Sequence, residues 1–494
     1  MSPAVLVAIV LGYFALLFGV ARRTGHHASN EGFFVGNRQS PWLLVAFGMV
    51  GTTLSGVTFV SVPGAVGRDG FTYFQIILGH FFGYLVIAFV LLPLYYRDGV
   101  TSIYHLLATR LGKGAHRTGA AFFILSRTLG ATARLYLVVA ILQATLLDAM
   151  GVPFALTAAV ILGLIVAYTF EGGVKTLVWT DLLQTACMLG GLVVVTLVLL
   201  DRLDLSFAQS LERLSEAGLS RVFATDPEAR NWFGKHFVAG AFIAIAMAGM
   251  DQEMMQKNIS VRRLADSQKN VVLLAFLMMG VVLLFLYLGG LLHLFAPAAG
   301  VTAQGDRLFP AVVMQELPAV VQLVFFIALV SALFPSADGA LTALTSSFCI
   351  DLLGLQERPR LSEAQRTRIR QQVHLAFAAV FLALVLGFHW LGNPSMIHVI
   401  LKVAAFTYGP LLGLFAFAIF VKRRPTDRLV PVVAIAAPIA CLLVDRNQAA
   451  LFGTWEVGLE ILVLNGAITF GGLWFISRPT AVAGQGFGTA DERR

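Results

Sequence analysis

Long apolar runs separated by short polar loops set the strongest limit on how this chain can fold. The run 319-AVVQLVFFIALV-330, for example, contains one polar side chain. Hydrophobic residues make up 58% of the 494-residue chain and charged residues 13%, whereas about a quarter of a soluble domain is charged. A helix needs about 20 mostly apolar residues to cross a bilayer. We therefore predict an all-α integral membrane protein surrounded by lipid.

About thirteen segments have the length and composition of membrane-spanning helices. The first is expected to be an uncleaved anchor, because Arg22 and Arg23 follow its apolar run instead of preceding it. The segments are expected at residues 3–21, 41–66, 72–96, 118–148, 154–170, 176–200, 235–256, 270–296, 319–350, 371–391, 395–421, 429–446 and 457–477.

The distribution of Lys and Arg predicts the orientation of the chain. Most of these residues fall in alternate loops, represented by Arg22, Arg97, Lys257, Arg358 and Lys422. Such loops stay on the cytoplasmic side, so we expect an inner (plasma) membrane protein with its N-terminus outside and its C-terminus in the cytoplasm. Because the cations behind the net charge of +8 lie in short loops, no nucleic-acid partner is expected. The three cysteines are expected to be free thiols.

An ionisable side chain inside an apolar segment marks a candidate functional site, because charge is costly in lipid. Asp181 lies near the start of the segment 176–200, and Gln184 and Thr185 share its helical face. We favour a functional role for this carboxylate, which has no evident compensating charge. The alternative is a helix-end carboxylate that reaches cytoplasmic water.

The segment 319–350 carries a dense group of oxygen-bearing side chains. Pro335 has no amide hydrogen, so the carbonyl of Ser331 loses its helical partner. Hard cations prefer surroundings made of oxygen, and we favour a cation site over a kinked helix whose hydroxyls bond back to its own turns. Four side chains fall within about 40° of one another around the helix: Ser331, Asp338, Thr342 and Thr345.

Two segments, 41–66 and 235–256, are rich in small residues and should form poor continuous helices. Broken helices are typical of secondary transporters, and close helix packing is the alternative reading. We expect each to open a five-helix repeat. The predicted parts are an extra helix and inner loop (1–40), a first repeat (41–200), an outer amphipathic loop (201–234), a second repeat (235–425), two C-terminal helices (426–478) and a cytoplasmic tail (479–494).

Arg127 and Arg134 share a helical face in the segment 118–148. They are expected to pair with carboxylates of the helix bundle, unless Arg127 reaches the inner surface; the sequence leaves both readings open. The chain shows no nucleophile–base motif, phosphate-binding loop or metal-binding histidine spacing. We therefore expect no enzyme and no catalytic residue.

Six motifs along the chain, taken in order, resemble those of the sodium/solute symporter family, which includes transporters of proline, sugars, sialic acid, pantothenate and choline. The resemblance covers about residues 31–425, and it implies a leucine-transporter-like core of five plus five inverted helices. The motifs are 33-FFVGNR, 51-GTTLSGVTF, 130-GATARLY, 172-GGVKTLVWTDLLQ, 249-GMDQEMMQKNIS and 335-PSADGALTALTSSFCIDL.

The resemblance also implies a sodium site between the broken segment 41–66 and the segment 319–350. The carbonyls of Gly51, Leu54 and Ala332 and the hydroxyl of Ser336 would be its ligands. Asp181 matches a family aspartate linked to sodium coupling or to a second sodium. Pro335 replaces a liganding hydroxyl of many members, and the Ser331 carbonyl or Asp338 is expected to substitute for it.

The expected solute pocket is small. The sugar-binding members carry Gln at the position of Thr58, and Asn or aromatic residues at positions that include Ala248. Here Thr53, Thr58 and Gln75 would orient the ligand beside Ala248. This pocket favours a compact amino acid, monocarboxylate or small quaternary amine. Among these solutes we favour an amino or carboxylic acid, because the N-termini of half-helices bind carboxylates.

Three functions remain open on sequence grounds. The favoured one is sodium-coupled uptake of a small organic solute by alternating access, with Na⁺ as the only cofactor and the protein as a monomer. The second is proton-coupled uptake with Asp181 or Asp338 as the proton carrier. The third is a transport-like sensor, which is less favoured because the chain ends soon after its last apolar segment.

Overall fold

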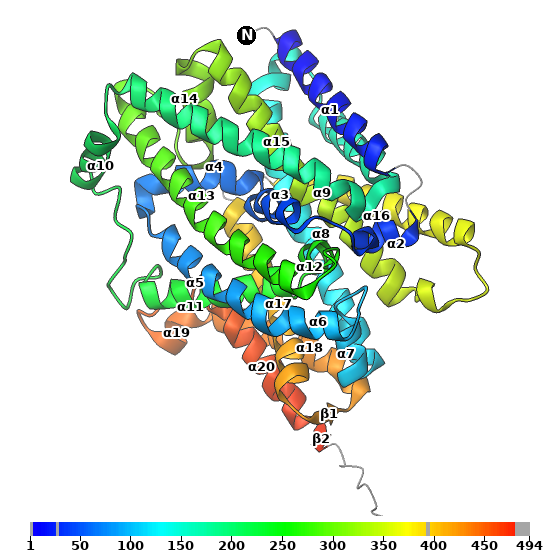
Figure 1. Cartoon of the computed structure of the whole chain (residues 1–494). Coiled ribbons are helices and arrows are strands. Elements are labelled where there is room, and N and C mark those ends of the chain that lie inside the picture. The colour runs from blue at the N-terminus through cyan, green and yellow to red at the C-terminus, as the bar shows by residue number, and fades with distance from the viewer. Residues whose placement is uncertain (1–2, 26–28, 392–395, 480–494) are drawn as a thin grey trace, which may run out of the picture.

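The computed structural model describes residues 3–25, 29–391 and 396–479, and helices dominate it (Figure 1). Every segment predicted to span the membrane is mostly helical in its described residues, which confirms the predicted fold class. By length and composition, eight helices of the described chain can cross a membrane, or ten if two bent helix pairs are counted as spans. Two shorter apolar helices cover Phe154–Phe170 and Ile461–Phe475. The count of thirteen crossings stays a prediction.

The helices of the first half are α1 (Pro3–Gly25), α2 (Asn30–Val35), α3 (Trp42–Leu54), α4 (Gly56–Asp69), α5 (Tyr73–Val86), α6 (Leu92–Arg97), α7 (His105–Arg110), α8 (Lys113–Leu142), α9 (Phe154–Arg202) and α10 (Phe207–Glu216). Those of the second half are α11 (Phe233–Ala244), α12 (Gln252–Ile259), α13 (Leu264–Ala298), α14 (Leu308–Glu316), α15 (Ala319–Ser347), α16 (Glu363–Leu391), α17 (Met396–Phe420), α18 (Val430–Arg446), α19 (Gln448–Phe452) and α20 (Ile461–Phe475). Single π-helical turns follow α5, α8, α11 and α15 at 87–91, 143–147, 245–249 and 348–352.

Both segments predicted to be weak are broken. Helices α3 and α4 meet at an angle of 56°, and Ser55 between them has φ 39° and ψ 162°, a backbone conformation that is rare outside glycine. Helix α11 with its π-turn (Phe233–Gly249) meets helix α12 at a bend of 65°. The prediction of two weakened opening segments is therefore confirmed, whereas the repeat boundaries themselves stay a prediction.

Helix α9 joins two predicted segments through one kink instead of a polar loop. Gly173 at the kink has φ 50° and ψ −138°, which glycine tolerates because it has no Cβ. The kink folds the helix back, since Tyr168 before it lies near Gln184 after it. As a result, both halves of α9 can contribute side chains to one site.

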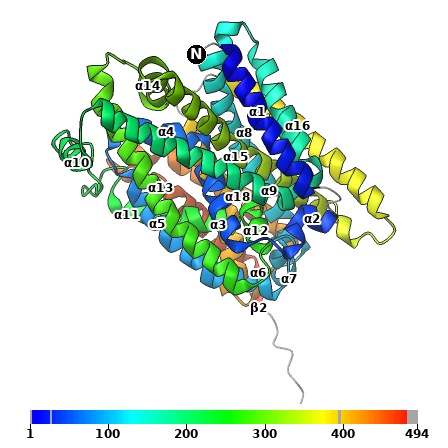
Figure 2. The same ribbon diagram turned by 45° about the horizontal axis from the view of Figure 1, so that its top comes forward.

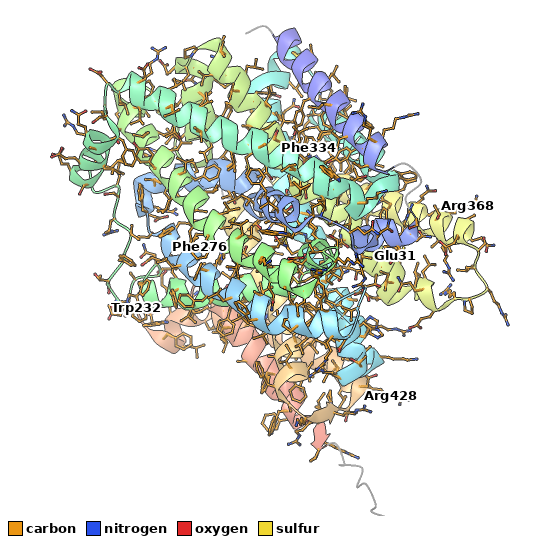
Figure 3. The ribbon with its side chains drawn as sticks, in the orientation of Figure 1. Glu31, Trp232, Phe276, Phe334, Arg368 and Arg428 are labelled. Atoms are coloured by element: carbon orange, nitrogen blue, oxygen red, sulfur yellow. The ribbon has the colours of Figure 1, made fainter. Side chains whose placement is uncertain are left out.

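Helix α15 continues through Pro335 without a break and packs against α9, α8 and α1. Phe334, one residue before the proline, is 1% exposed and points into the bundle in Figure 3. Its ring meets the edge of Phe14 at a centroid distance of 4.9 Å and that of Tyr168 at 6.5 Å. These aromatic contacts hold α15 in place between α1 and α9.

The predicted outer and inner segments lie on opposite sides of the bundle. Figure 1 shows α10 and α19 on one side and α2 and α7 on the other, and Figure 2 shows the same separation for α10 and α2. One feature departs from the all-helical expectation: β1 (Arg423–Pro425) pairs with β2 (Ser477–Pro479) in antiparallel fashion after α17 and α20. The predicted tail lies beyond residue 479, outside the described residues.

Candidate ion and solute site

The break between α3 and α4 faces the middle of α15. A methyl group built on Gly56 would lie 3.7 Å from the carbonyl oxygen of Ala332, and one built on Gly51 would lie 3.6 Å from Cγ of Pro335. The last carbonyls of a helix have no helical partner, and Leu54 ends α3. The structure therefore brings together the backbone segments that were expected to bind sodium.

Ser336 lies on the same buried stretch of α15 and is 2% exposed. The carbonyl of Gly51 accepts the amide of Ser55 at 3.3 Å, a long hydrogen bond at the very end of α3. Sodium ligation by these residues stays a prediction, and it is supported by the burial of Ser336 next to Pro335, which lies against Gly51 of α3.

Asp181 does not stand alone, and the expectation that it has no compensating charge is wrong. Nζ of Lys257 lies 2.7 Å from Oδ2 of Asp181 and 2.8 Å from Oγ1 of Thr52. Asp181 and Lys257 are each 1% exposed. The second carboxylate oxygen, Oδ1, has no hydrogen-bond partner in the described part of the chain. Asp181 thus belongs to a buried ion pair that keeps one oxygen available.

Lys257 was expected in a cytoplasmic loop, and this placement is also wrong. The bend before α12 turns that helix into the bundle, so all of its residues are buried. Asp251 stabilises the bend, because its Oδ1 accepts the backbone amides of Glu253 at 2.9 Å and Met254 at 3.3 Å. Such a side-chain cap satisfies amides that a helix start leaves free.

Glycine lets α3 approach Asp181 closely. A Cβ at Gly48 would lie 3.0 Å from Cβ of Asp181, closer than most Cβ contacts, so a larger residue would push the two helices apart. The hydroxyl of Thr185, one turn after Asp181, donates to the carbonyl of Gly48 at 3.4 Å. Close packing at Gly48 therefore brings Thr52 of α3 within reach of the ion pair.

Arg127 pairs with carboxylates of the bundle, the first of the two readings left open. Its guanidinium bonds the carboxylate of Glu253 and lies 3.8 Å from Asp251. The other oxygen of Glu253 lies 3.8 Å from Nζ of Lys257. A continuous charged network therefore links α8, α12 and α9 through Arg127, Glu253, Lys257 and Asp181.

The charged residues of α12 were not recognised as intramembrane groups. The motif 249-GMDQEMMQKNIS places Glu253 and Lys257 four residues apart, on one helical face. Opposite charges four residues apart at the end of an apolar segment were the sequence signal for an ion pair inside the membrane. The sequence could not show that the 65° bend would bury this pattern.

Asp338 has hydrogen-bond partners on both of its carboxylate oxygens. Tyr168 donates a hydrogen bond to Oδ2, and the amide of Gly339 donates to Oδ1 at 2.5 Å. Ser331 donates to the hydroxyl of Tyr13 at 2.8 Å. The oxygen-bearing face of α15 is buried, and neighbouring helices already bond Ser331 and Asp338; the cation site on this face stays a prediction.

Three of the expected solute-binding residues lie around the two helix bends. Thr53 is half-buried near Tyr84, and its hydroxyl donates back to the carbonyl of Met49 at 2.8 Å. Thr58 is half-buried in the first turn of α4. Ala248 is 6% exposed in the π-turn 245–249 before α12. Their contact with a solute stays a prediction.

Gln75 makes structural contacts with the outer loop. Its Nε2 donates to the carbonyls of Thr72 at 3.1 Å and Asn231 at 3.0 Å, and its Oε1 accepts the amide of Ala224 at 3.0 Å. Because these bonds occupy the amide, the geometry does not support a solute-binding role, which stays an untested prediction.

Arg134 differs from Arg127 in having no carboxylate within ion-pair distance among the described residues. It is half-buried, with Tyr73 as a neighbour. Val138, one turn further along the same face of α8, packs directly on Gly56 at the break between α3 and α4. The structure therefore places an unpaired cation beside the helix break.

The chain matches the sodium:solute symporter family over residues 33–427. It is 23% identical over 490 residues to the sodium/sialic acid symporter SiaT of Proteus mirabilis (strain HI4320), and the alignment covers 94% of each chain. It is 27% identical over 480 residues to the sodium/iodide cotransporter of Homo sapiens, covering 92% of this chain and 71% of the relative. It is 25% identical over 411 residues to the human sodium-coupled monocarboxylate transporter 2, covering 79% of this chain and 64% of the relative.

A solved structure, the substrate-bound outward-open state of a Na⁺-coupled sialic acid symporter, has the same fold. Its TM-score is 0.82 at 19% identity, over 96% of this chain and 99% of that one. This likeness confirms the predicted leucine-transporter-like architecture. Since the family match extends over residues 33–427, the chain belongs to the sodium:solute symporter family.

Proposed function

We propose that this protein is a secondary active transporter that couples the uptake of a small organic anion, a carboxylate, to sodium. One observation carries the choice of an anion: Arg134, beside the break between α3 and α4, has no carboxylate partner in the described chain. A cation without an ion-pair partner is costly inside a membrane, even when it is only half-buried. A carboxylate solute would supply the missing charge and accept two hydrogen bonds from the guanidinium.

The arrangement of the backbone supports sodium as the coupling ion. The end of α3 at Leu54 and the carbonyl of Ala332 lie at the break, and the buried Ser336 is one helical turn after Ala332 on α15. Oxygen atoms of this kind suit a hard cation. With the cation and the anion in adjacent places, each ligand raises the affinity for the other by the same factor. Alternating access would then move both across the membrane together.

The relatives support the same solute class. Their names refer to sialic acid, iodide and monocarboxylates, and all three are anions at neutral pH. The relatives are only 23% to 27% identical to this chain, so their individual substrates cannot be assigned to it. The shared chemistry of these solutes, together with Arg134, favours an anion over a sugar or a quaternary amine.

The remaining properties follow from the same proposal. The protein would act as a transporter and not as an enzyme, and it would work as a monomer in the plasma membrane. Its N-terminus would lie outside and its C-terminus in the cytoplasm, as the loop charges indicate. The proton-coupled alternative is less favoured, because the relatives are named as sodium-coupled transporters.

Uptake into proteoliposomes tests the proposal. Purified protein would be given labelled pyruvate, lactate, N-acetylneuraminate, proline, choline or glucose, with an inward gradient of Na⁺ or of K⁺ at fixed pH. We expect at least one carboxylate to accumulate with Na⁺ and not with K⁺. Uptake of glucose or choline alone would overturn the choice of solute. Uptake that follows a pH gradient and ignores Na⁺ would overturn the choice of coupling ion.

A further inference from the structure

We propose that the ammonium group of Lys257 serves as a built-in cation at Asp181 and takes the place that a second coupling sodium would occupy. The transporter would then bind one Na⁺ per chain, at the break between α3 and α4. This inference rests on the proposed sodium coupling. It adds the number of Na⁺ ions bound per chain and names Lys257 as the residue that limits that number.

The contacts of Lys257 are those of a bound cation. Nζ has two oxygen partners, Oδ2 of Asp181 at 2.7 Å and Oγ1 of Thr52 at 2.8 Å, and it lies 3.8 Å from Glu253. These groups come from three different helices, α9, α3 and α12. An ammonium group offers three donors and no acceptor, so it matches a pocket lined by oxygen as a metal cation does.

Burial makes the competition between Lys257 and sodium severe. Both Lys257 and Asp181 are 1% exposed, so little water screens their charges. A sodium ion about 4 Å from the ammonium would bind about a thousandfold more weakly at an effective dielectric constant of about 20. The carboxylate can hold Lys257 or a sodium ion, but not both.

The surrounding charges show what removal of Lys257 would do. The network contains the carboxylates of Asp181, Glu253 and Asp251, and the cations of Arg127 and Lys257. Without Lys257, Asp181 would lose its ion pair, and Arg127 would be the remaining ion-pair partner of Glu253 and Asp251 in the described structure. Oδ1 of Asp181 has no hydrogen-bond partner in the described structure. A small cation from solution would therefore enter beside Asp181.

A purely structural ion pair is the competing explanation, and binding stoichiometry separates the two. Equilibrium binding of ²²Na⁺ to the purified full-length protein would be measured for wild type and for Lys257→Met, which keeps the length of the side chain and removes its charge. We expect one Na⁺ per wild-type chain and two per variant chain, with a Hill coefficient that rises from about 1 toward 2. A folded Lys257→Met that still binds one Na⁺ would overturn the inference.

Two matched variants control for charge and position. Lys257→Arg keeps the cation and should keep one Na⁺, and Lys269→Met removes an exposed lysine that pairs with Asp266 and should also keep one. Size-exclusion chromatography and thermal unfolding would report whether each variant is folded.

The double variant Asp181→Asn/Lys257→Met keeps the test valid if the single variant does not fold. It removes both charges of the pair, a change that buried ion pairs often tolerate. We expect it to bind one Na⁺, as wild type does. A wild type that binds two and a double variant that binds one would show that sodium already uses Asp181, and would overturn the inference.

Failure of the proposed function gives a different result. Wild-type protein that binds no Na⁺ would reject sodium coupling itself. In that case a gain from zero to one Na⁺ in Lys257→Met would still support the role of Lys257, and no gain would reject it.

Discussion

The hydroxyl of Tyr408 donates a 2.6 Å hydrogen bond to Oδ2 of Asp251 and so joins α17 to the bend between α11 and α12. The other carboxylate oxygen of Asp251 accepts two backbone amides at the start of α12. One buried carboxylate therefore fixes the start of the helix that carries Lys257. The position of the charged network depends on this contact as much as on the ion pairs themselves.

Replacement of Tyr408 by Phe should destabilise the protein by about 1–2 kcal/mol, because Oδ2 of Asp251 loses a buried hydrogen bond. The change would appear as a lower unfolding temperature of the detergent-solubilised chain. Tyr136→Phe is the matched control, since no hydrogen bond of the Tyr136 hydroxyl is present among the described residues. Equal unfolding temperatures for the two variants would rule out a stabilising role for the Tyr408–Asp251 contact.

Replacement of Arg127 by Met should be more damaging, at about 3–5 kcal/mol, because it leaves Glu253 buried without its main cation. The yield of folded protein and its unfolding temperature would both fall. The double variant Arg127→Met/Glu253→Gln should recover much of the loss, because it removes both charges. A double variant that is no more stable than Arg127→Met would show that the two residues do not act as a pair.

Asp181→Asn alone should lower stability by about 3–5 kcal/mol, because Lys257 would remain buried without its 2.7 Å partner. A purely functional role for Asp181, with no compensating charge, would instead give a variant that folds normally and loses coupling. Thermal unfolding decides between these expectations. An Asp181→Asn protein as stable as wild type would mean that the ion pair contributes nothing to folding.

The sequence predicted the fold well where local composition decides the structure. The glycines and Ser55 of the segment 41–66 weaken a helix locally, and the structure breaks it there. The partners of buried charges were not predictable in the same way. Lys257 and Asp181 lie far apart in the chain, and only the bend before α12 brings them together. The role of Gln75 depends likewise on an outer loop whose path the sequence does not reveal.

Arg134→Met should reduce sodium-driven carboxylate uptake by at least about tenfold, since a charge-assisted bidentate contact contributes about 1.5–3 kcal/mol. Stability should change little, because Arg134 has no ion pair to lose within the described structure. Arg134→Lys should retain part of the uptake, because it keeps the charge and loses the planar geometry. Uptake by Arg134→Met at the wild-type rate, from protein that is equally well folded, would remove Arg134 from the solute site.

Ser336→Ala should raise the sodium concentration needed for half-maximal uptake about fivefold, because one hydroxyl ligand contributes about 1 kcal/mol. Maximal uptake at saturating Na⁺ should change less, since the backbone carbonyls of the helix break remain. Ser346→Ala is the matched control on the same helix, because the Ser346 hydroxyl only donates back to the carbonyl of Thr342 at 2.8 Å. A sodium titration of Ser336→Ala that overlays those of wild type and Ser346→Ala would show that the ion site uses backbone carbonyls alone or lies elsewhere. A shift confined to Ser336→Ala would place the coupling ion where the end of α3 meets α15.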